Sequence, residues 1–365
     1  MSLHWLVVYF VVFDVSFVLA LVLTPIFRQL SHRWGWIDQP DQERKIHAQS
    51  MPLLGGLAVF CAFAGNLLLH YLVVLPLAGK ISMAAFNLSD LQVHIGGALS
   101  VWNKLAVLLV GGAWMVGLGL YDDKHDLKAG WKLAGQVVIA LAVALAGMRV
   151  TVFIANDWVN IAVTVLWIVT ITNALNFLDN MDGLCAGVGV VCAGLFAFIA
   201  GVQGQYFVCL LALAFAGALL GFLPYNFKPA TIFLGDAGSH FVGYMLAVLP
   251  VLTTFYREGV PTHLPVLIPL LVLAVPLFDM AMVMGLRFRR RQPVYVGDAN
   301  HLSHRLVKLG LPQSWAVTLI YLITLTLGLG ATVLLWSNMT AALVVIVQAI
   351  GILAIVTLLE QLGNK

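Results

Sequence analysis

Charged residues are scarce in this chain, and the scarcity argues against an ordinary soluble protein. Asp, Glu, Lys and Arg make up only 10% of its 365 residues, whereas apolar residues make up 61% and the mean hydropathy is +0.98. So few charges cannot cover the surface of a soluble fold. A soluble helical protein with a large core is the alternative, but the composition favours a membrane protein.

Cysteine is scarce as well, and several other features are missing. The four cysteines lie in or beside apolar segments without metal-ligand spacing, so we interpret them as packing residues; they are Cys61, Cys185, Cys192 and Cys209. We find no repeat, no low-complexity tract and no connection long enough for a second soluble domain. The first apolar segment has no basic stretch before it and no clear small-residue cleavage site, so we expect no removable signal peptide. We therefore expect one domain over 1–365.

Long apolar runs are what the chain has in abundance. They are about 18 to 25 residues long, which is enough for a helix to cross a bilayer. We predict an all-α, polytopic membrane bundle with 10 or 11 transmembrane helices. The candidate spans are 5–30, 52–78, 104–121, 133–148, 158–178, 184–201, 205–225, 239–256, 263–286, 315–336 and 340–360.

The basic residues predict an orientation. If the N-terminus lies outside, fifteen of the nineteen Lys and Arg residues fall in inner connections or at the C-terminus, and four fall outside. Because inner connections carry the excess of Lys and Arg, we expect an outer N-terminus and a cytoplasmic C-terminus.

Five polar motifs fall in connections that this orientation places on the cytoplasmic side. They are RKIHAQSMPLLGG (44–56), YDDKHDLKAGWK (121–132), NFLDNMDGL (176–184), FKPATIFLGDAGS (227–239) and RFRRRQPVYVGDANHLSHRL (287–306). The outer connections are bland by comparison. This convergence predicts a single site at the inner leaflet.

Acidic residues dominate three of these motifs. The adjacent Asp122 and Asp123 repel each other unless a divalent metal or a nearby lysine intervenes, although a solvated helix end would also explain them. Asp236, between two glycines, is either a metal ligand that also meets phosphate or the N-cap of the next helix. Asp179 and Asp182 follow Asn173 and Asn176 at steps of three, and this set suits a sugar or a base plus a metal. Hydrogen bonding between helices is the alternative, above all for the deeper Asn173.

The last motif combines histidines with a basic run. His301 and His304 are three residues apart, and Arg305 follows them. The pair is a weak zinc signal without a third ligand, so we favour phosphate binding. The arginines of 287–291 also suit anchoring at anionic lipid. Asp14 and Asp279 lie inside apolar spans, where aspartates are functional candidates. Asp279 could reach the site or support its helices, whereas we assign no role to Asp14.

Taken together, the motifs resemble those of the polyprenyl-phosphate N-acetylhexosamine-1-phosphate transferases, the family of bacterial translocase I (MraY) and the WecA/TagO enzymes. The resemblance runs through nearly the whole chain in family order and is carried by Asp122-Asp123, by the Asn173–Leu184 run and by FLGDAGS. The stretch from Asp38 to His47 looks closer to the WecA/TagO branch. The family's His-x-His-His departs here, because Ser303 replaces the middle histidine and Arg305 follows where an apolar residue is usual.

The resemblance implies a reaction at the cytoplasmic face of a bacterial inner membrane. The phosphate of undecaprenyl phosphate attacks a UDP-N-acetylhexosamine, most often the GlcNAc form, giving undecaprenyl-diphospho-sugar and UMP for a cell-envelope polysaccharide such as O-antigen. Mg²⁺, or Mn²⁺ in its place, bridges the phosphates. No nucleic acid is implied, a homodimer is left open, and so is a covalent aspartate intermediate. A transporter or ion channel is the alternative, but its polar residues would gather at the midplane.

The resemblance also implies roles for individual residues. Asp236 holds the metal with help from Asp123, and Asp122 takes the proton from the acceptor phosphate or orients it. Asn173, Asn176, Asp179 and Asp182 hold the nucleotide-sugar. The phosphate ligands are Lys45, Lys132, His301, His304 and Arg305, assisted by His47.

Overall fold

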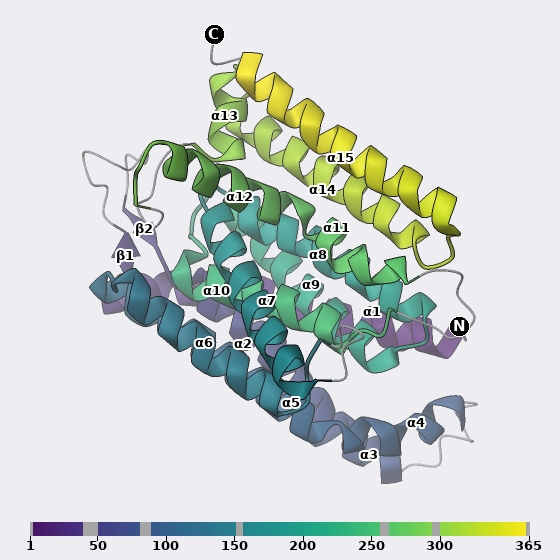
Figure 1. Ribbon diagram of the computed structural model, residues 1–365. Helices are drawn as coiled ribbons and strands as arrows, with labels where there is room; N and C mark the ends of the chain where they lie inside the picture. Colours follow the sequence, from purple (N-terminus) through teal and green to yellow (C-terminus); the bar gives the residue numbers. More distant parts are fainter. Residues whose placement is uncertain are drawn as a thin grey trace.

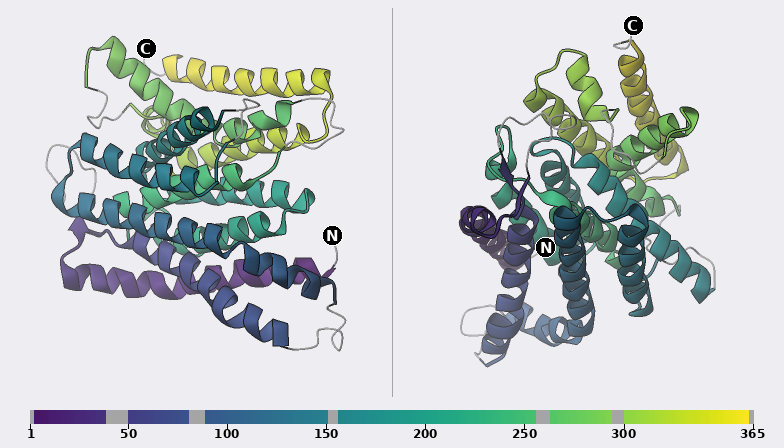
Figure 2. Two further views of the ribbon diagram at one scale, coloured as in Figure 1. Left: turned by 60° about the horizontal axis from the view of Figure 1, so that its bottom comes forward. Right: turned by 90° about the vertical axis from the view of Figure 1, so that its left-hand side faces the viewer.

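The computed structural model describes residues 3–38, 50–80, 89–150, 156–255, 263–293 and 300–362. In these ranges the chain is almost entirely helical, and its longer helices form one bundle (Figure 1). Figure 2 shows the same bundle from two further directions. The described strands form one short antiparallel pair, in which β1 (Ile37–Asp38) meets β2 (Met51–Pro52). The all-α prediction is confirmed.

Each predicted span contains helical structure. In chain order the helices are α1 (Leu3–Trp34), α2 (Gly55–Leu69), the π-helical η1 (His70–Val74), α3 (Leu75–Lys80), α4 (Ser89–Ser100), α5 (Trp102–His125), α6 (Ala129–Leu145), α7 (Asp157–Leu178), α8 (Leu184–Val202), α9 (Tyr206–Asn226), α10 (Gly235–Leu252), the 3₁₀ turn η3 (Leu264–Leu267), α11 (Ile268–Val272), α12 (Ala274–Arg289), α13 (Leu302–Lys308), α14 (Gln313–Val333) and α15 (Met339–Leu362).

The number of helices suited to cross a membrane is smaller than predicted. Within the described residues, eight helices are long and apolar enough, and a bent segment makes a ninth. Helix α6 is a shorter apolar helix of 17 residues, and α10 carries Asp236 and His240 in its first turns. Length and composition therefore support eight or nine spans instead of ten or eleven.

The predicted span 263–286 is broken. The helical segments Leu264–Val272 and Ala274–Arg289 meet at an angle of 69°. Pro276 lies in the first turn of the second segment, where its missing N–H is tolerated. In one continuous helix the same proline would remove a backbone hydrogen bond, which favours a break before it.

Helix α10 is the buried centre of the bundle and sets the position of Asp236. A Cβ atom on Gly119 of α5 would lie 2.3 Å from Cα of Ala237. A Cβ atom on Gly56 of α2 would lie 2.1 Å from the backbone N of Gly238. Glycine at both positions lets the backbones approach more closely than any side chain would allow. The close approach brings the first turn of α10 against the end of α5.

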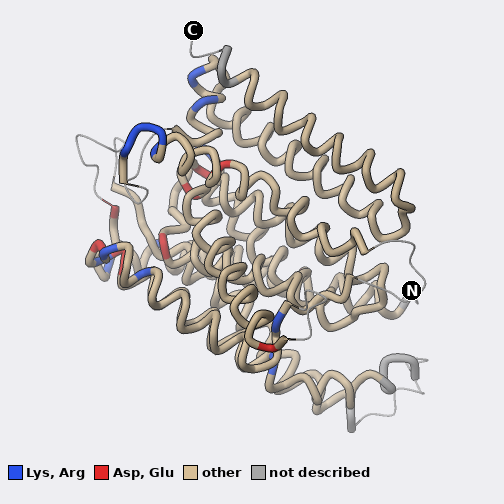
Figure 3. Tube along the Cα trace, viewed as in Figure 1, with Lys and Arg blue, Asp and Glu red and all other residues tan. Residues whose placement is uncertain are grey.

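Charged residues gather mainly at one end of the bundle, where β1, β2 and α13 lie and α6 begins (Figure 3). Helix α1 begins near the opposite end, and α15 ends on the charged side (Figures 1 and 2). The charged end matches the predicted convergence of polar motifs. The side of the membrane that it faces stays a prediction.

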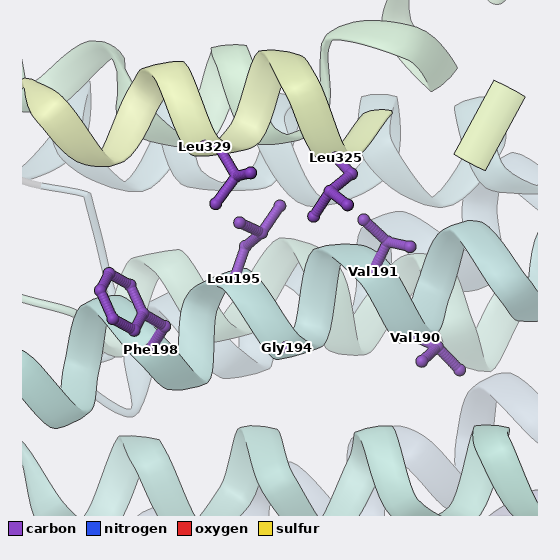
Figure 4. A pocket seen from close by; sticks show the side chains of 7 residues that line it. All are labelled: Val190, Val191, Gly194, Leu195, Phe198, Leu325 and Leu329. Atoms are coloured by element: carbon purple, nitrogen blue, oxygen red, sulfur yellow. The ribbon is translucent and has the colours of Figure 1, made fainter. Parts of the chain in front are cut away.

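An apolar pocket of about 360 Å³ lies elsewhere, between α8 and α14. Figure 4 shows Val191 and Leu195 of α8 facing Leu325 and Leu329 of α14 across it. Its lining includes none of the residues that the motifs predict for the site, so we do not assign it to the chemistry.

Candidate active site

Two carboxylates and one lysine form the centre of the charged end. Lys132 near the start of α6 forms ion pairs with Asp122 of α5 and with Asp236 of α10, and its Nζ lies 3.5 Å from Oδ2 of Asp236. The Asp122 side chain is almost fully buried, and its Oδ1 accepts the N–H of Leu127 at 2.9 Å. That bond ties the turn between α5 and α6 to the cluster. One cation thus holds two acidic groups that would otherwise repel each other.

Asp123 has a different task from its neighbour. Its Oδ1 accepts the N–H of Asp236 at 2.9 Å, and its Oδ2 accepts the N–H of Ala237 at 3.3 Å. These N–H groups belong to the first turn of α10, where backbone donors have no partner inside the helix. Asp123 therefore caps α10, which is the task that the sequence alternative assigned to Asp236.

Asn176 of α7 fixes the Asp236 side chain from the other side. Its Nδ2 donates to Oδ1 of Asp236 at 2.8 Å and to Oγ of Ser239 at 2.9 Å. Both contacts use the amide as a donor to oxygens of α10. Asn176 and Asp236, predicted from separate motifs, are thereby brought into one cluster.

Asn173 lies one turn deeper and has another partner. Its Nδ2 donates to Oε1 of the fully buried Gln136 at 2.6 Å and to the backbone O of Val169 at 2.8 Å. This is the hydrogen bond between helices that the sequence left open for Asn173. Substrate contact by Asn173 stays a prediction without support from these contacts.

Asp179 follows the last residue of α7, at the edge of the cluster. Burial, together with the smaller effect of the negative charges of Asp236 and Asp182, raises the pKa of its carboxyl to about 8. Among the described residues its side chain has no hydrogen-bond or ion-pair partner. The carboxyl is therefore placed for a ligand that brings positive charge or a hydrogen-bond donor.

Asp182 lies in the same connection and is buried. Its Oδ2 accepts the N–H of Ala230 at 3.2 Å and lies 3.7 Å from Nζ of Lys228. Its Oδ1 is buried without a hydrogen-bond partner in the described part of the chain. A buried acceptor of this kind normally meets a donor, so Oδ1 is suited to bind a ligand group.

The histidine motif reaches the site through α13. His301 is the N-cap residue of α13, and its Nδ1 lies 2.8 Å from Oδ2 of the buried Asp279. The ring of His304 lies 6.3 Å from that of His301, between centroids. The structure therefore places the two histidines together. Arg305 follows on the same short helix.

Ser303 connects α13 to the acidic connection. Its Oγ donates a hydrogen bond to Oδ1 of Asn180, whose Nδ2 donates to the backbone O of Phe177 at 2.8 Å. The ring of Phe177 also contacts that of His301 at 6.2 Å. The residue that departs from the family motif is thus buried in a contact between two parts of the site.

The structure brings most of the predicted residues together. Asp122, Lys132, Asn176 and Asp236 form the cluster, whereas Lys45 and His47 lie outside the described residues. Sequence reasoning missed several partners: Gln136, Asn180, Ser239 and Lys228. Asn180, Ser239 and Lys228 lie inside quoted motifs and could have been found there, but Gln136 sits in an apolar segment without any motif signal.

The cluster is compatible with Mg²⁺ but not with a fully protein-bound metal. Within the described residues, no group of three His, Cys, Asp or Glu side chains could hold a metal ion. Mg²⁺ usually takes one or two carboxylates and completes its shell with water and phosphate oxygens. Asp236 supplies such a carboxylate, so the site fits the ion. The predicted help from Asp123 stays a prediction, because both oxygens of Asp123 accept backbone N–H groups of α10.

Comparisons with known proteins agree with the motifs. The family model described as glycosyl transferase family 4 matches residues 105–254. A probable undecaprenyl-phosphate N-acetylglucosaminyl 1-phosphate transferase of Bacillus subtilis is 31% identical, over 97% of this chain and 93% of its own length. A decaprenyl-phosphate N-acetylglucosaminephosphotransferase of Mycobacterium tuberculosis is 31% identical, over 92% of this chain and 84% of its own length. A phospho-N-acetylmuramoyl-pentapeptide-transferase of Lacticaseibacillus paracasei is 36% identical over half of this chain and 61% of its own length.

Proposed function

This chain belongs to glycosyl transferase family 4, and we propose that it transfers N-acetylhexosamine 1-phosphate from a UDP-sugar to undecaprenyl phosphate. GlcNAc is the sugar that we propose, because the Bacillus and Mycobacterium relatives are named for it. The products are undecaprenyl-diphospho-GlcNAc and UMP. A transporter or ion channel gains no support from these relatives, which are named as transferases.

The main observation behind this proposal is that Asp122, Lys132 and Asp236 lie together at the charged end of an apolar bundle. A lipid phosphate and a nucleotide diphosphate are both anions, so bringing them together requires positive charge. Lys132 supplies one cation. The carboxylate of Asp236 supplies a ligand for a second one, because Mg²⁺ bound there would neutralise charge on the diphosphate.

The remaining residues position the reactants. Asn176 keeps Asp236 in one orientation through its Nδ2 donor. Asp179 and Oδ1 of Asp182, which has no hydrogen-bond partner within the described ranges, offer acceptors for donor groups of the base or the sugar. Asp122 orients the acceptor phosphate or takes its proton, and the ion pair with Lys132 keeps that buried carboxylate in place.

The site also suits a lipid acceptor by its place in the fold. The acceptor's tail must stay in the bilayer while its phosphate meets a soluble nucleotide, so the site has to lie at the membrane interface. We propose that this interface is the cytoplasmic face of a bacterial inner membrane, with the N-terminus outside. The chain then catalyses the first membrane step of a cell-envelope polysaccharide.

The test is UMP release by purified protein supplied with Mg²⁺, undecaprenyl phosphate and a panel of UDP-sugars. We expect release with UDP-GlcNAc, and loss of release with EDTA or in Asp236→Asn. Asp157→Asn is the matched control, because Asp157 is an exposed aspartate of α7 that pairs with Arg149 outside the cluster. Folded wild-type protein that releases no UMP with any donor contradicts the proposal. Substrate flux into sealed vesicles without UMP release favours a transporter instead.

A further inference from the structure

Asp279 is an aspartate inside the broken ninth span that the proposed reaction does not yet use. It lies in α12 and is 1% exposed. A buried carboxylate in an apolar helix is costly unless hydrogen bonds compensate for the lost water. The partners of Asp279 therefore indicate why the chain keeps it there.

Both oxygens of Asp279 contact the start of α13. Oδ1 accepts the backbone N–H of Leu302 at 2.7 Å, and Oδ2 lies 2.8 Å from Nδ1 of His301. The first contact fixes the backbone at the beginning of α13. The second fixes the imidazole ring, and each supports the geometry of the other.

The contact with His301 determines which ring nitrogen is left for a ligand. A carboxylate only accepts hydrogen bonds, so Nδ1 carries the hydrogen that points to Asp279. The other nitrogen, Nε2, has no hydrogen-bond partner among the described residues. The ring also packs edge-on against Phe177, two residues before Asp179. Two sides of the ring are thus held by protein, next to the end of α7.

We infer that Asp279 is a positioning residue that fixes the tautomer and the orientation of His301, so that Nε2 is presented to a phosphate group of the substrate. The inference rests on the proposed transferase reaction. His301 is the residue that touches the substrate, and Asp279 acts through it. A carboxylate that accepts the hydrogen of one ring nitrogen fixes the ring and leaves the other nitrogen available. Carboxylates that are hydrogen-bonded to metal-bound histidines act in the same way.

The decisive variant is Asp279→Asn, which keeps the size of the side chain. Asparagine has one acceptor oxygen, whereas Leu302 and His301 each present a hydrogen to this position. Either the ring or the helix start loses its partner, and an amide hydrogen facing Nδ1 favours the other tautomer. We expect kcat for UMP release to fall by about 10- to 100-fold. Asp157→Asn, the same change at an exposed aspartate in the first turn of α7, is expected to leave kcat unchanged.

A double variant separates positioning from packing. In a His301→Gln background, Asp279→Asn is expected to lower kcat by less than about twofold, because the residue that it positions is already gone. A full additional loss in that background means that Asp279 acts through the fold and overturns the inference.

A measurement that does not depend on catalysis tests the contact between Asp279 and His301 even if the proposed transferase reaction is wrong. Nitrogen NMR of ¹⁵N-histidine-labelled protein in nanodiscs, with His301→Gln to assign the signal, is expected to show hydrogen on Nδ1 of His301. That signal is expected to change in Asp279→Asn. A wild-type ring with its hydrogen only on Nε2 overturns the inference. Absence of UMP release together with the expected NMR signal overturns the proposed reaction and the phosphate role, but keeps the Asp279–His301 contact.

Discussion

The carboxylate of Asp123 holds the helix that carries Asp236, because it accepts the N–H of Asp236 at 2.9 Å and that of Ala237 at 3.3 Å. Asp122, the adjacent residue, instead forms an ion pair with Lys132. The two neighbouring aspartates thus have separate tasks. One builds the first turn of α10, and the other takes part in the charged cluster.

The first prediction concerns this cap. Asp123→Asn leaves one acceptor oxygen for two backbone donors, so we expect a loss of about 1 kcal/mol in folding free energy. Thermal unfolding of purified protein in EDTA measures the effect without metal. The matched control is Asp126→Asn, because Asp126 ends α5 at φ 47°, a conformation that asparagine tolerates equally well. Unchanged unfolding together with lost UMP release would show that Asp123 meets the metal or the substrate instead.

The second prediction concerns the cation of the cluster. Lys132→Met removes the partner of Asp122 and Asp236, and we expect UMP release to fall on the order of 100-fold. Lys132→Arg keeps the charge and is expected to retain more activity than Lys132→Met. Lys128→Met is the control, because Lys128 is an exposed lysine at the start of α6. Equal losses in the Lys132→Met and Lys128→Met variants would argue for general electrostatic attraction over a specific contact.

Much of this site could be predicted because its signals are local. Apolar run lengths predict the helices, and the alternation of basic connections predicts that polar motifs share one end. Asp122 and Asn176 near the ends of α5 and α7 then meet Lys132 and Asp236 near the starts of α6 and α10. None of these steps requires the packing of individual side chains.

Tasks that depend on packing could not be predicted. Adjacent residues of a helix point about 100° apart, so only the neighbours of α5 show that Asp122 meets Lys132 and Asp123 meets α10. The partner of Asn173 was equally hidden, because Gln136 lies in another apolar segment. The bend before α12 escaped detection because both of its segments are apolar and read as one span.

The third prediction follows from the carboxyl of Asp179, whose pKa is raised to about 8 by burial and by the charges of Asp236 and Asp182. An unfolded aspartate has a pKa near 3.9, so the folded state binds this proton more tightly. The stability that the protonated carboxyl contributes is complete below about pH 3.9 and is lost as pH rises through about 8.

Asparagine at position 179 has no proton to lose. We therefore expect Asp179→Asn to unfold at a higher temperature than wild-type protein above pH 8 in EDTA, with the difference shrinking toward pH 5. The same variant is expected to release UMP more slowly, which is the usual conflict between stability and activity at a site. A difference in unfolding temperature that stays constant from pH 5 to pH 9 would contradict the raised pKa.

The last prediction concerns the serine that stands where the family has a histidine. Ser303 is 1% exposed, and its Oγ donates to Oδ1 of Asn180, between Asp179 and Asp182. Ser303→Ala removes that donor and leaves Oδ1 of Asn180 without it, at a cost of about 1 kcal/mol. Because Asn180 belongs to the connection that we assign to the nucleotide-sugar, we expect KM for the UDP-sugar to rise and KM for the lipid to stay unchanged.

A matched buried serine makes this test specific. Ser337 is 6% exposed and donates only within its own chain segment, to the backbone O of Val333. Ser337→Ala is expected to change neither KM value. If Ser303→Ala also leaves the UDP-sugar KM unchanged, the contact between Ser303 and Asn180 does not contribute to binding of the UDP-sugar. Ser303 then does not take over a role of the family's histidine in donor recognition. A rise confined to the UDP-sugar instead makes the Ser303–Asn180 contact part of donor recognition in this chain.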